Sequence, residues 1–511
     1  MTKLPWWKRL MMAAGGGAAV LLAVVGQAKR GDSAEPTAPA QSKAFKYYGS
    51  ATCSACHATT PDGPKTPFGY SVEFIKLNES ITWEKEDKHS VAYKRLDSER
   101  GRRMASLLKI DVNQREAGCL NCHSASTAEM ANRFKQGIQY NPSEGVSCEN
   151  CHGPYSGWAG EHMQETFRTT STADWEKVGF VDLRSPDRKA EKCLSCHIGS
   201  VGEGKVVTHE MYAAGHPPLP SIEVATFADS IPRHWWLNSE RKNDEIKKSL
   251  GYVEGQLEET RLAFVGAAVA LRTSMRLLAD EAAAKEKEGA PGQEWPDYAR
   301  FDCWSCHHDL KRESWRQARG YHEGPPGRVP VSEWPLTLVE LGIDHLAGSD
   351  PAEKSLAADL AKYRNALREQ ANARPFGRKA NMARAAGDFA AWSDLLVKKL
   401  STAQFDKAAA SKLLRKLVEK ADLSPSDYDP ARHVGWTIQL LVHELGDTLP
   451  NRPAIEGVLA KIREGLKLDL PAGRKYEIED QIAHALEVIG DYEPAAFQAQ
   501  LKELLALLPP G

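Results

Sequence analysis

Apolar positions recur with helical spacing along the second half of the chain. From Ile246 to Leu278 they fall at steps of three, four or seven residues, which predicts one long helix packed against a core. Two stripes of similar period lie near the C-terminal end: Ile455, Val458, Ile462 and Leu466, and then Ile478, Ile482, Leu486 and Ile489. Pro453 and Pro494 stand near the expected helix starts, because proline fits the first helical turn. Residues 331–511 are therefore predicted to form an α-helical domain.

Residues 46–330 lack regular stripes outside the long helix. They are dense in Gly, Pro, Asn and Ser and contain few alternating apolar runs, which predicts short helices and loops rather than sheets. The predicted fold class is therefore mainly α. A domain of short helices and loops over residues 46–330, including the one long helix, is followed by the C-terminal helical domain of residues 331–511.

The N-terminus carries an apolar run behind basic residues. Lysine and arginine occur within the first nine positions, and Leu10–Val25 is apolar and rich in small residues, as in a secretory signal. Residues 1–28 are therefore predicted to be a signal peptide or an uncleaved N-terminal anchor that associates with the membrane. Residues 29–45, rich in Ala, Pro, Ser and Thr, are predicted to be a disordered tether. No later segment is expected to span a bilayer.

The charge composition bears on only one class of partner, nucleic acids. The 511 residues include 66 Lys and Arg against 68 Asp and Glu, for a formal net charge of −2. No long block of one sign occurs, so no nucleic-acid partner is expected.

The cysteines carry the chemistry. All 10 fall in C-x-x-C pairs, and histidine follows each pair directly. The pairs are Cys53/Cys56, Cys119/Cys122, Cys148/Cys151, Cys193/Cys196 and Cys303/Cys306, and the histidines are His57, His123, His152, His197 and His307. C-x-x-C-H is the attachment signature of haem c, in which two thioethers fix the porphyrin and the histidine binds the iron. Two intervening residues let both sulfurs reach one macrocycle, and the next side chain then points under its centre.

Zinc sites, disulfides and redox-active dithiols are the alternatives for C-x-x-C pairs. None of them requires histidine after every pair. Histidine is only 16 of 511 residues, so five chance placements have a probability on the order of 10⁻⁸. The sequence therefore predicts five covalent haems c with their irons. Haem c is attached outside the cytoplasm, so a periplasmic location is expected, in agreement with the apolar N-terminal run.

A second axial ligand decides what each haem can do. An iron with two histidines is six-coordinate and passes electrons, whereas an iron with one histidine has an open position for a small molecule. Four histidines outside the motifs are predicted to be second ligands: His89, His162, His209 and His216. His234 and His308 are the further candidates for the fifth iron. The histidines beyond residue 330, including His433 and His443, are expected to be structural.

One motif and its surroundings resemble a known family. The run Gly145–Pro154, GVSCENCHGP, is similar to the G-V-x-C-x-x-C-H-G-P element of bacterial multihaem cytochromes c. That group includes the tetrahaem electron-transfer cytochrome of ammonia oxidisers and, more distantly, hydroxylamine oxidoreductase. Trp83 with His89, and the segment His209–Pro217, resemble the group's distal-ligand segments. The resemblance covers roughly residues 47–230 and implies closely packed, mostly bis-histidine haems in parallel-stacked and perpendicular pairs.

The resemblance also has limits. No C-x-x-C-K motif of ammonia-forming nitrite reductases occurs, and hydroxylamine oxidoreductases have more haems than five. Those activities are therefore not carried over. The fifth motif lies beyond the similar region, and residues 331–511 resemble no family.

Two functions follow. The first is electron transfer, with other cytochromes or membrane quinol-linked complexes as redox partners. The alternative is an oxidoreductase that acts on a small nitrogen or sulfur compound at one five-coordinate haem, assisted by Arg102, Arg103, Arg233 or His234. The number of true second ligands separates these functions.

Five complete motifs predict five covalent haems in the mature protein. Protein made in a host competent for cytochrome c maturation should show five haem additions in its intact mass, and a matching pyridine haemochrome. Two or fewer additions would contradict the interpretation of the motifs.

Overall fold

Helices provide the regular structure of the chain, as the sequence predicts. The computed structural model describes residues 45–59, 73–124, 141–284, 295–308, 310, 314–318, 324–420, 427–468 and 490–510. Residues 44–511 form one compact unit, and residues 1–43 form a separate one. The predicted signal peptide or anchor, nearly all of the predicted tether, and the stripe from Ile478 to Ile489 lie outside the described residues. Within the described part, extended pairing is limited to two isolated bridges, Ser200 with Lys205 and Phe301 with Val331.

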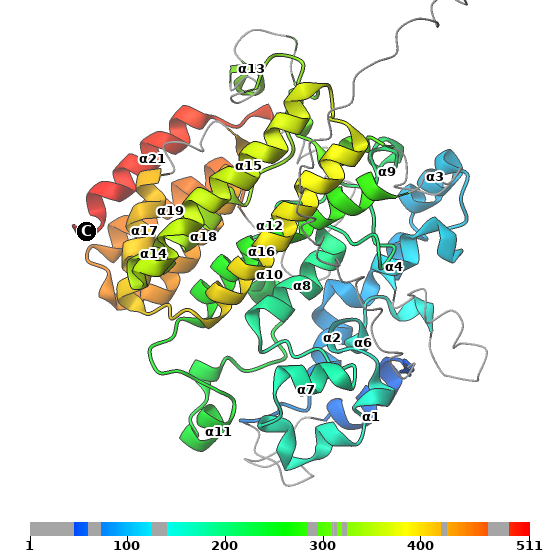
Figure 1. The fold of residues 1–511 in the computed structure, drawn as a ribbon. Coiled ribbons are helices and arrows are strands. Elements are labelled where there is room, and N and C mark those ends of the chain that lie inside the picture. Colours follow the sequence, from blue (N-terminus) through cyan, green and yellow to red (C-terminus); the bar gives the residue numbers. More distant parts are fainter. Residues whose placement is uncertain are drawn as a thin grey trace, which may run out of the picture. The chain divides into compact units, whose positions relative to one another are not determined.

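The helices fall into a short class and a long class (Figure 1). The shorter helices come first along the chain: α1 (Ser50–His57), α2 (Glu79–Glu86), α3 (Glu99–Leu108), α4 (Cys119–His123), α6 (Cys148–His152), α7 (Thr172–Lys177), α8 (Pro186–His197), α9 (His209–Ala214), α10 (Val224–Ser230) and α11 (Asp244–Ser249). The long helix α12 (Glu258–Ala283) and the short α13 (Trp315–Ala318) follow. The C-terminal helices are α14 (Leu336–Ser349), α15 (Ser355–Ala373), α16 (Lys379–Thr402), α17 (Lys407–Lys420), α18 (Tyr428–Leu445), α19 (Arg452–Leu466) and α21 (Pro494–Leu507).

Four of the five C-x-x-C-H motifs form the last turn of a short helix. They end α1, α4, α6 and α8, and the fifth begins at the short 3-10 helix η12 (Cys303–Ser305). In a helix, residues three and four apart share one face, so the two cysteines and the histidine of each motif point to the same side. The helical turn therefore presents both thiols and the imidazole to one neighbour.

The predicted long helix begins later than its sequence pattern. Ile246 lies in α11, and the chain then leaves the helical conformation before α12 starts at Glu258. Gly251 and Gly255 break the helix, with φ of 74° and 77°, a region that glycine adopts at little cost. The Glu444 carboxylate of α18 then accepts the backbone N–H groups of Glu259 and Thr260, at 3.2 and 2.7 Å. Tertiary capping therefore decides where α12 begins, which periodicity alone does not reveal.

Helix α12 is the centre of the hydrophobic core. It packs against α8, α10, α14, α16 and α18, and every residue from Leu262 to Leu271 is buried. Gly266 lets α10 approach closely, because a Cβ atom there would lie 2.8 Å from Cβ of Val224. Contrary to the expectation that no later segment qualifies, α12 is long and apolar enough to cross a membrane. However, 78% of its most apolar stretch is buried inside the protein, as in a core helix.

The C-terminal helices share this core. Ile455, Val458 and Ile462 of α19 are buried, as their stripe predicts, and α19 and α21 carry proline in the first turn. One cluster of buried side chains runs from Ala190 in α8 to Leu508. The division at residue 330 stays a prediction, but the packing across it is continuous, since α16 covers much of α12.

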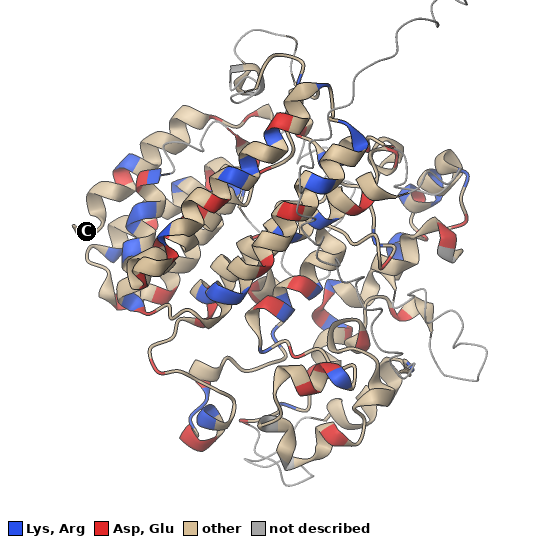
Figure 2. Ribbon diagram, viewed as in Figure 1, with Lys and Arg blue, Asp and Glu red and all other residues tan. Residues whose placement is uncertain are grey.

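Charged side chains of both signs are interspersed along the helices. Figure 2 shows acidic and basic residues alternating over α14–α19, with no extended region of one sign in that view. The mixture fits the near-zero net charge of the chain.

Removing residues 331–511 should prevent folding of the remainder. The truncation would expose the face of α12 that α14, α16 and α18 cover, and each large apolar side chain exposed costs about 2 kcal/mol. We expect the truncated protein to be insoluble or degraded when it is exported and matured beside the full chain.

The matched control replaces residues 1–43 with an unrelated secretion signal. Because residues 1–43 form a separate unit, that change should leave the thermal midpoint within error. A soluble 1–330 fragment with the absorption spectrum of the full chain would contradict the shared core.

Candidate functional site

A cavity of about 1000 Å³ lies among the helices that carry the first four motifs. Seven of the eight cysteines of these motifs line it, Cys56 being the exception. Eight histidines also line it: His57, His89, His123, His152, His162, His197, His216 and His234. Four are motif histidines and four are not, so the cavity holds one additional histidine for each of its motifs.

Three motif histidines face a histidine from outside the motifs. The ring centres are 6.4 Å apart for His89 with His197, and 6.4 Å apart for His123 with His216. The ring centres of His209 and His307 of the fifth motif are 6.2 Å apart. The structure therefore brings together three of the four predicted second ligands with three of the five motif histidines.

The spacing of these pairs matches two imidazoles that share one metal. A metal–nitrogen bond of about 2.0 Å and about 1.1 Å from that nitrogen to the ring centre give about 6.2 Å between the two ring centres. Ordinary aromatic contacts also reach about 7 Å, so the distance alone does not decide. The identity of the paired residues favours a shared metal, because each of the three pairs joins one motif histidine to one histidine outside the motifs.

The other two motif histidines have partners at longer range. The charge of His57 lowers the pKa of both His162 and His152, and the charge of His234 also lowers the pKa of His152. All four side chains line the cavity. These interactions make His162 the candidate partner of His57, and His234 the candidate partner of His152.

Most of these imidazoles are held by their Nδ1 atoms. The Nδ1 atom of His89 lies 2.9 Å from the Asp87 carboxylate, and that of His57 lies 3.0 Å from the Glu79 carboxylate. Backbone carbonyl oxygens take the same role at 2.9 Å for His123, 2.7 Å for His162 and 2.7 Å for His216. Metal-binding histidines are commonly oriented through one ring nitrogen in this way, which leaves Nε2 as the nitrogen that can bind a metal.

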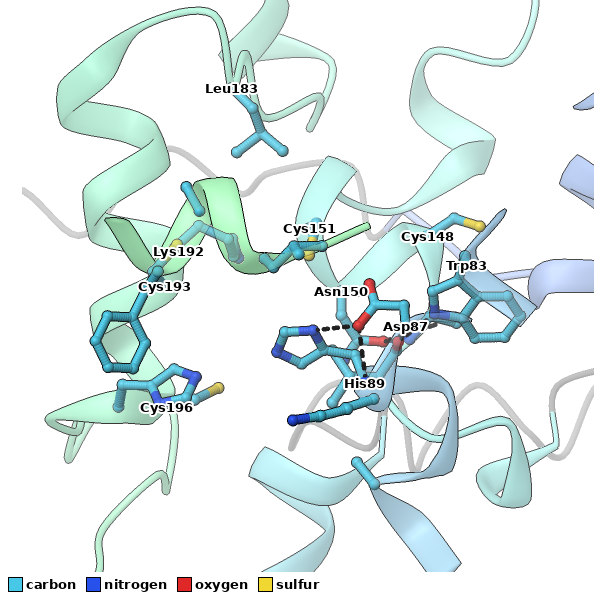
Figure 3. Close-up of a pocket in the computed structure, with 18 of the residues that line it drawn as sticks. Trp83, Asp87, His89, Cys148, Asn150, Cys151, Leu183, Lys192, Cys193 and Cys196 are labelled. Atoms are coloured by element: carbon cyan, nitrogen blue, oxygen red, sulfur yellow. Dashed lines mark hydrogen bonds and ion pairs between the residues drawn. The ribbon is translucent and has the colours of Figure 1, made fainter. Parts of the chain in front are cut away.

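Figure 3 shows one side of this arrangement. Cys193 and Cys196 on α8 face His89 across the cavity. The Asp87 carboxylate interacts with both the backbone N–H and the Nδ1 atom of His89. The His89 side chain is 37% exposed, and it lines the cavity. An imidazole fixed on one edge and open on the other is prepared to bind a ligand that enters the slot.

Burial keeps most of the cavity histidines neutral. It lowers the pKa of His152, His197 and His216 to about 4, and it also lowers the pKa of His123, His162 and His234. Burial acts in the same direction on His89, but the Asp87 carboxylate outweighs it and the pKa of His89 is raised. A neutral imidazole has the free lone pair that a metal requires.

Two glycines set the backbone that carries the second ligands. At Gly145, with φ of 73°, a Cβ atom would lie 2.6 Å from the carbonyl oxygen of His89, so only glycine lets the third motif approach His89 this closely. At Gly215, with φ of 118°, the chain turns at the end of α9, and the His216 N–H returns to the Met211 carbonyl at 2.9 Å. This turn directs His216 toward His123.

The fifth motif lies apart from the cavity, and Asp297 ties it to its partner histidine. The Asp297 carboxylate accepts the backbone N–H of His209 at 3.1 Å and that of Ala299 at 2.8 Å. Arg300 pairs with the buried Glu281 of α12 at 2.7 Å. The segment before the fifth motif is thus fixed to both α9 and α12. The motif itself is open to solvent, with Cys303 and Cys306 exposed.

The motifs of the cavity are close neighbours. The thiols of Cys53 and Cys148 contact each other, and so do those of Cys122 and Cys196. All ten cysteines are free of disulfides. Among the described residues, no three His, Cys, Asp or Glu side chains converge on one point, as a zinc site requires. The first and third motifs are therefore adjacent, as are the second and fourth.

The lining of the cavity fits haem. It is mostly apolar around the motif histidines, and it includes more basic than acidic side chains. The Arg261 Nε atom is buried there without a hydrogen-bond partner. A haem would place an apolar ring between the paired imidazoles and bring carboxylates to such cations. The residues present therefore suit the group that the motifs predict.

The sequence alone did not decide whether His234 is a second ligand. In the structure, His234 lines the cavity. Its position beside Trp235 and Trp236 carries no periodic signal, so only the tertiary fold brings it near the third motif. His308, the other candidate, does not line the cavity, and its Nδ1 lies 3.2 Å from the Gln317 side chain. The sequence also contains no sign that Glu79 and Asp297 orient histidines. Asp87 is different, because it lies two residues before His89 and has the local signal of a helix cap.

Replacing Asp297 with alanine should loosen His209. Loss of a cap of this kind costs about 1 kcal/mol, and His209 would then face His307 less often. In the holoprotein we expect a high-spin signal from a fraction of one haem, with the total haem content unchanged.

Asp350→Ala is the matched control, because Asp350 caps Ala352 in the same way at 2.9 Å and lies far from the motifs along the chain. It should leave the spin state unaltered. Equal spectra for Asp297→Ala and the unaltered protein would contradict the positioning role.

The comparisons with known proteins bear on this same region. No curated protein and no solved structure matches the chain. The family model described as cytochrome c554 and c-prime matches residues 77–153, a span that contains His89 and the second and third motifs. The match is narrower than the predicted resemblance over residues 47–230, and it implies covalent haem c in this segment. Residues 77–153 are thus a domain of the cytochrome c554 and c-prime family, a family of multihaem c-type cytochromes.

Proposed function

We propose that the protein is an exported cytochrome with five covalent haems c, each iron bound by two histidines, and that its function is electron transfer. The observation that carries this proposal is the pairing of histidines. Three motif histidines face a histidine from outside the motifs at the ring spacing of a shared metal, and the other two each share the cavity with one further candidate. The proposed second ligands are His162, His216, His234, His89 and His209, for the first to the fifth motif in that order.

The chain supplies three things to such a relay. The cysteines fix the position of each porphyrin, and the paired histidines occupy both axial positions. The carboxylates and carbonyl groups on Nδ1 hold the imidazoles and increase their basicity. A haem c ligated in this way changes its oxidation state with little change in geometry, and its potential is set by axial ligands, burial and neighbouring charge.

The order of the motifs in space supports a continuous route. The first motif contacts the third and the second contacts the fourth through their thiols. The charges of Cys193 and Cys196 act on Cys151, which places the third motif near the fourth. Helix α9 begins with His209, and His216 follows its C-cap residue Gly215, so one short segment carries candidate ligands for both the fifth and the second motif. These contacts suggest the sequence first, third, fourth, second, fifth.

Both ends of this sequence reach the surface. Cys56 of the first motif is exposed, as are Cys303 and Cys306 of the fifth, whereas the other seven cysteines are half-buried. Electron donors and acceptors need access to a haem edge, so we propose that redox partner proteins bind near these two motifs. A periplasmic location follows from the export signal predicted in residues 1–28 and from where haem c is attached.

The alternative function needs one iron with an open position. The side chains suggested as its helpers do not favour it. Arg102 and Arg103 are exposed on α3, Arg233 pairs with Glu240 at 2.8 Å, and none of the three lines the cavity. His234 does line it, but as the candidate ligand of the third motif. The electron-transfer reading is therefore the better supported one.

Carbon monoxide tests the proposal. If all five irons have two histidines, the fully reduced protein should bind no stoichiometric carbon monoxide, because it would have to displace a bound imidazole. Replacing His234 with alanine should open one iron and create one carbon monoxide site per protein, with the haem content still at five.

His443→Ala is the control, since His443 is an exposed residue of α18. It should leave the protein unreactive. One carbon monoxide bound per molecule of the unaltered protein, with a high-spin signal in its oxidised form, would instead favour the enzyme.

A further inference from the structure

The cavity contains more positive than negative side chains. Ten Lys and Arg residues line it against six Asp and Glu residues. Among the acids, Glu79 and Asp87 are committed to His57 and His89. Among the cations, Arg184 pairs with Asp182 and Lys205 pairs with Glu203. A protein interior rarely holds unbalanced charge without a counterion, so the excess of cations needs an explanation.

Lys189 is the first of the cations that the protein leaves without a carboxylate. It lies on α8 one helical turn before Cys193, and it lines the cavity. Its ammonium group lies 5.3 Å from the ring centre of Trp235, and it has no ion pair among the described residues. Burial lowers the pKa of Lys189.

Arg261 is the second such cation. It reaches the same cavity from the first turn of α12. Its Nε atom is buried and has no hydrogen-bond partner, which leaves a donor unsatisfied at a cost of about 1–3 kcal/mol. The nearby Glu258 carboxylate acts on both Lys189 and Arg261 at a distance. It accepts the Asn238 N–H at 2.9 Å and the Ser239 N–H at 3.4 Å, so it forms no ion pair with either cation.

We propose that Lys189 and Arg261 together form a binding site for the propionate carboxylates of a haem in the cavity. The proposal rests on the proposed function. A guanidinium and an ammonium are the side chains that bind carboxylates best. Propionate carboxylates would give the Nε atom of Arg261 a hydrogen-bond partner and the ammonium group of Lys189 a counterion.

The site then serves a haem other than that of the fourth motif. The thioethers and the propionates lie on opposite edges of haem c. Since Lys189 is one turn from Cys193, it is at the thioether edge of the haem of the fourth motif, away from the propionates of that haem. Lys189 stacks on Trp235, and the ring of Trp235 is 5.0 Å from that of His234, the candidate ligand of the third motif.

Two cations at this place raise the reduction potential of that haem. Reduction adds one negative charge to the haem, and a nearby positive charge in a poorly hydrated cavity stabilises the product. They also offset the propionate charge, which otherwise favours the oxidised iron. Removing either cation should therefore make reduction harder.

The experiment is a spectroscopic redox titration of the complete holoprotein with Lys189→Gln and Arg261→Gln. In each variant, one of the five potentials should become more negative by at least about 59 mV, which is a tenfold change in the equilibrium constant of a one-electron reduction. The exchanges Lys189→Arg and Arg261→Lys should keep most of the original potential. Lys248→Gln, which removes the same charge from an exposed position on α11, should leave all potentials within error.

Haem content and spin state are measured on the same samples. If Lys189→Gln is unstable, Lys189→Met keeps an apolar chain against Trp235 and should show the same shift. Unmoved potentials in variants that hold five low-spin haems would overturn this inference alone. Unaltered protein without covalent haem would overturn the proposed function and this inference together.

Discussion

A slot between two histidine rings is the constraint on which the first half of the molecule depends. The rings of a pair are 6.2–6.4 Å apart, and each ring is contributed by a different segment of the chain. His89 precedes His197 by more than a hundred residues, and His209 precedes His307 by nearly as many. The short helices, the glycine turns and the carboxylates behind the rings all serve to keep such distant segments at this separation. In the proposed holoprotein, apolar haem faces would take the place of packed side chains in this region.

The helical half supplies most of the hydrophobic core of the molecule. Helix α12 is buried along most of its length, and α8, which ends in the fourth motif, packs directly on it. Arg272 of α12 binds Glu191 of α8 on one side and Asp394 of α16 on the other. The fifth motif is joined to the same framework, since Arg300 reaches Glu281 and the Trp304 Nε1 donates to Asp429 of α18 at 3.4 Å. The C-terminal helices thus act on two motifs through the core, which gives them a role beyond that of an appended domain.

Local chemistry could be read from the sequence, and long-range contact could not. The C-x-x-C-H motifs, the mainly helical fold and the stripe of α19 depend on neighbours within a few residues, so their patterns were sufficient. The start of α12 depends on Glu444, which lies far along the chain, and periodicity placed it about twelve residues too early. His234 shows the same limit. Nothing adjacent to it marks a ligand, whereas His89 follows a capping aspartate and His216 follows a glycine turn. The cations Lys189 and Arg261 gain their meaning only from the cavity that they share.

A holoprotein structure with anomalous scattering measured at the iron edge tests the central claim most directly. The account predicts five iron positions, each between the Nε2 atoms of one motif histidine and one histidine from outside the motifs. The pairs should be His57 with His162, His123 with His216, His152 with His234, His197 with His89, and His307 with His209. An iron with a single histidine, or one bound by a residue outside this set, would contradict the account.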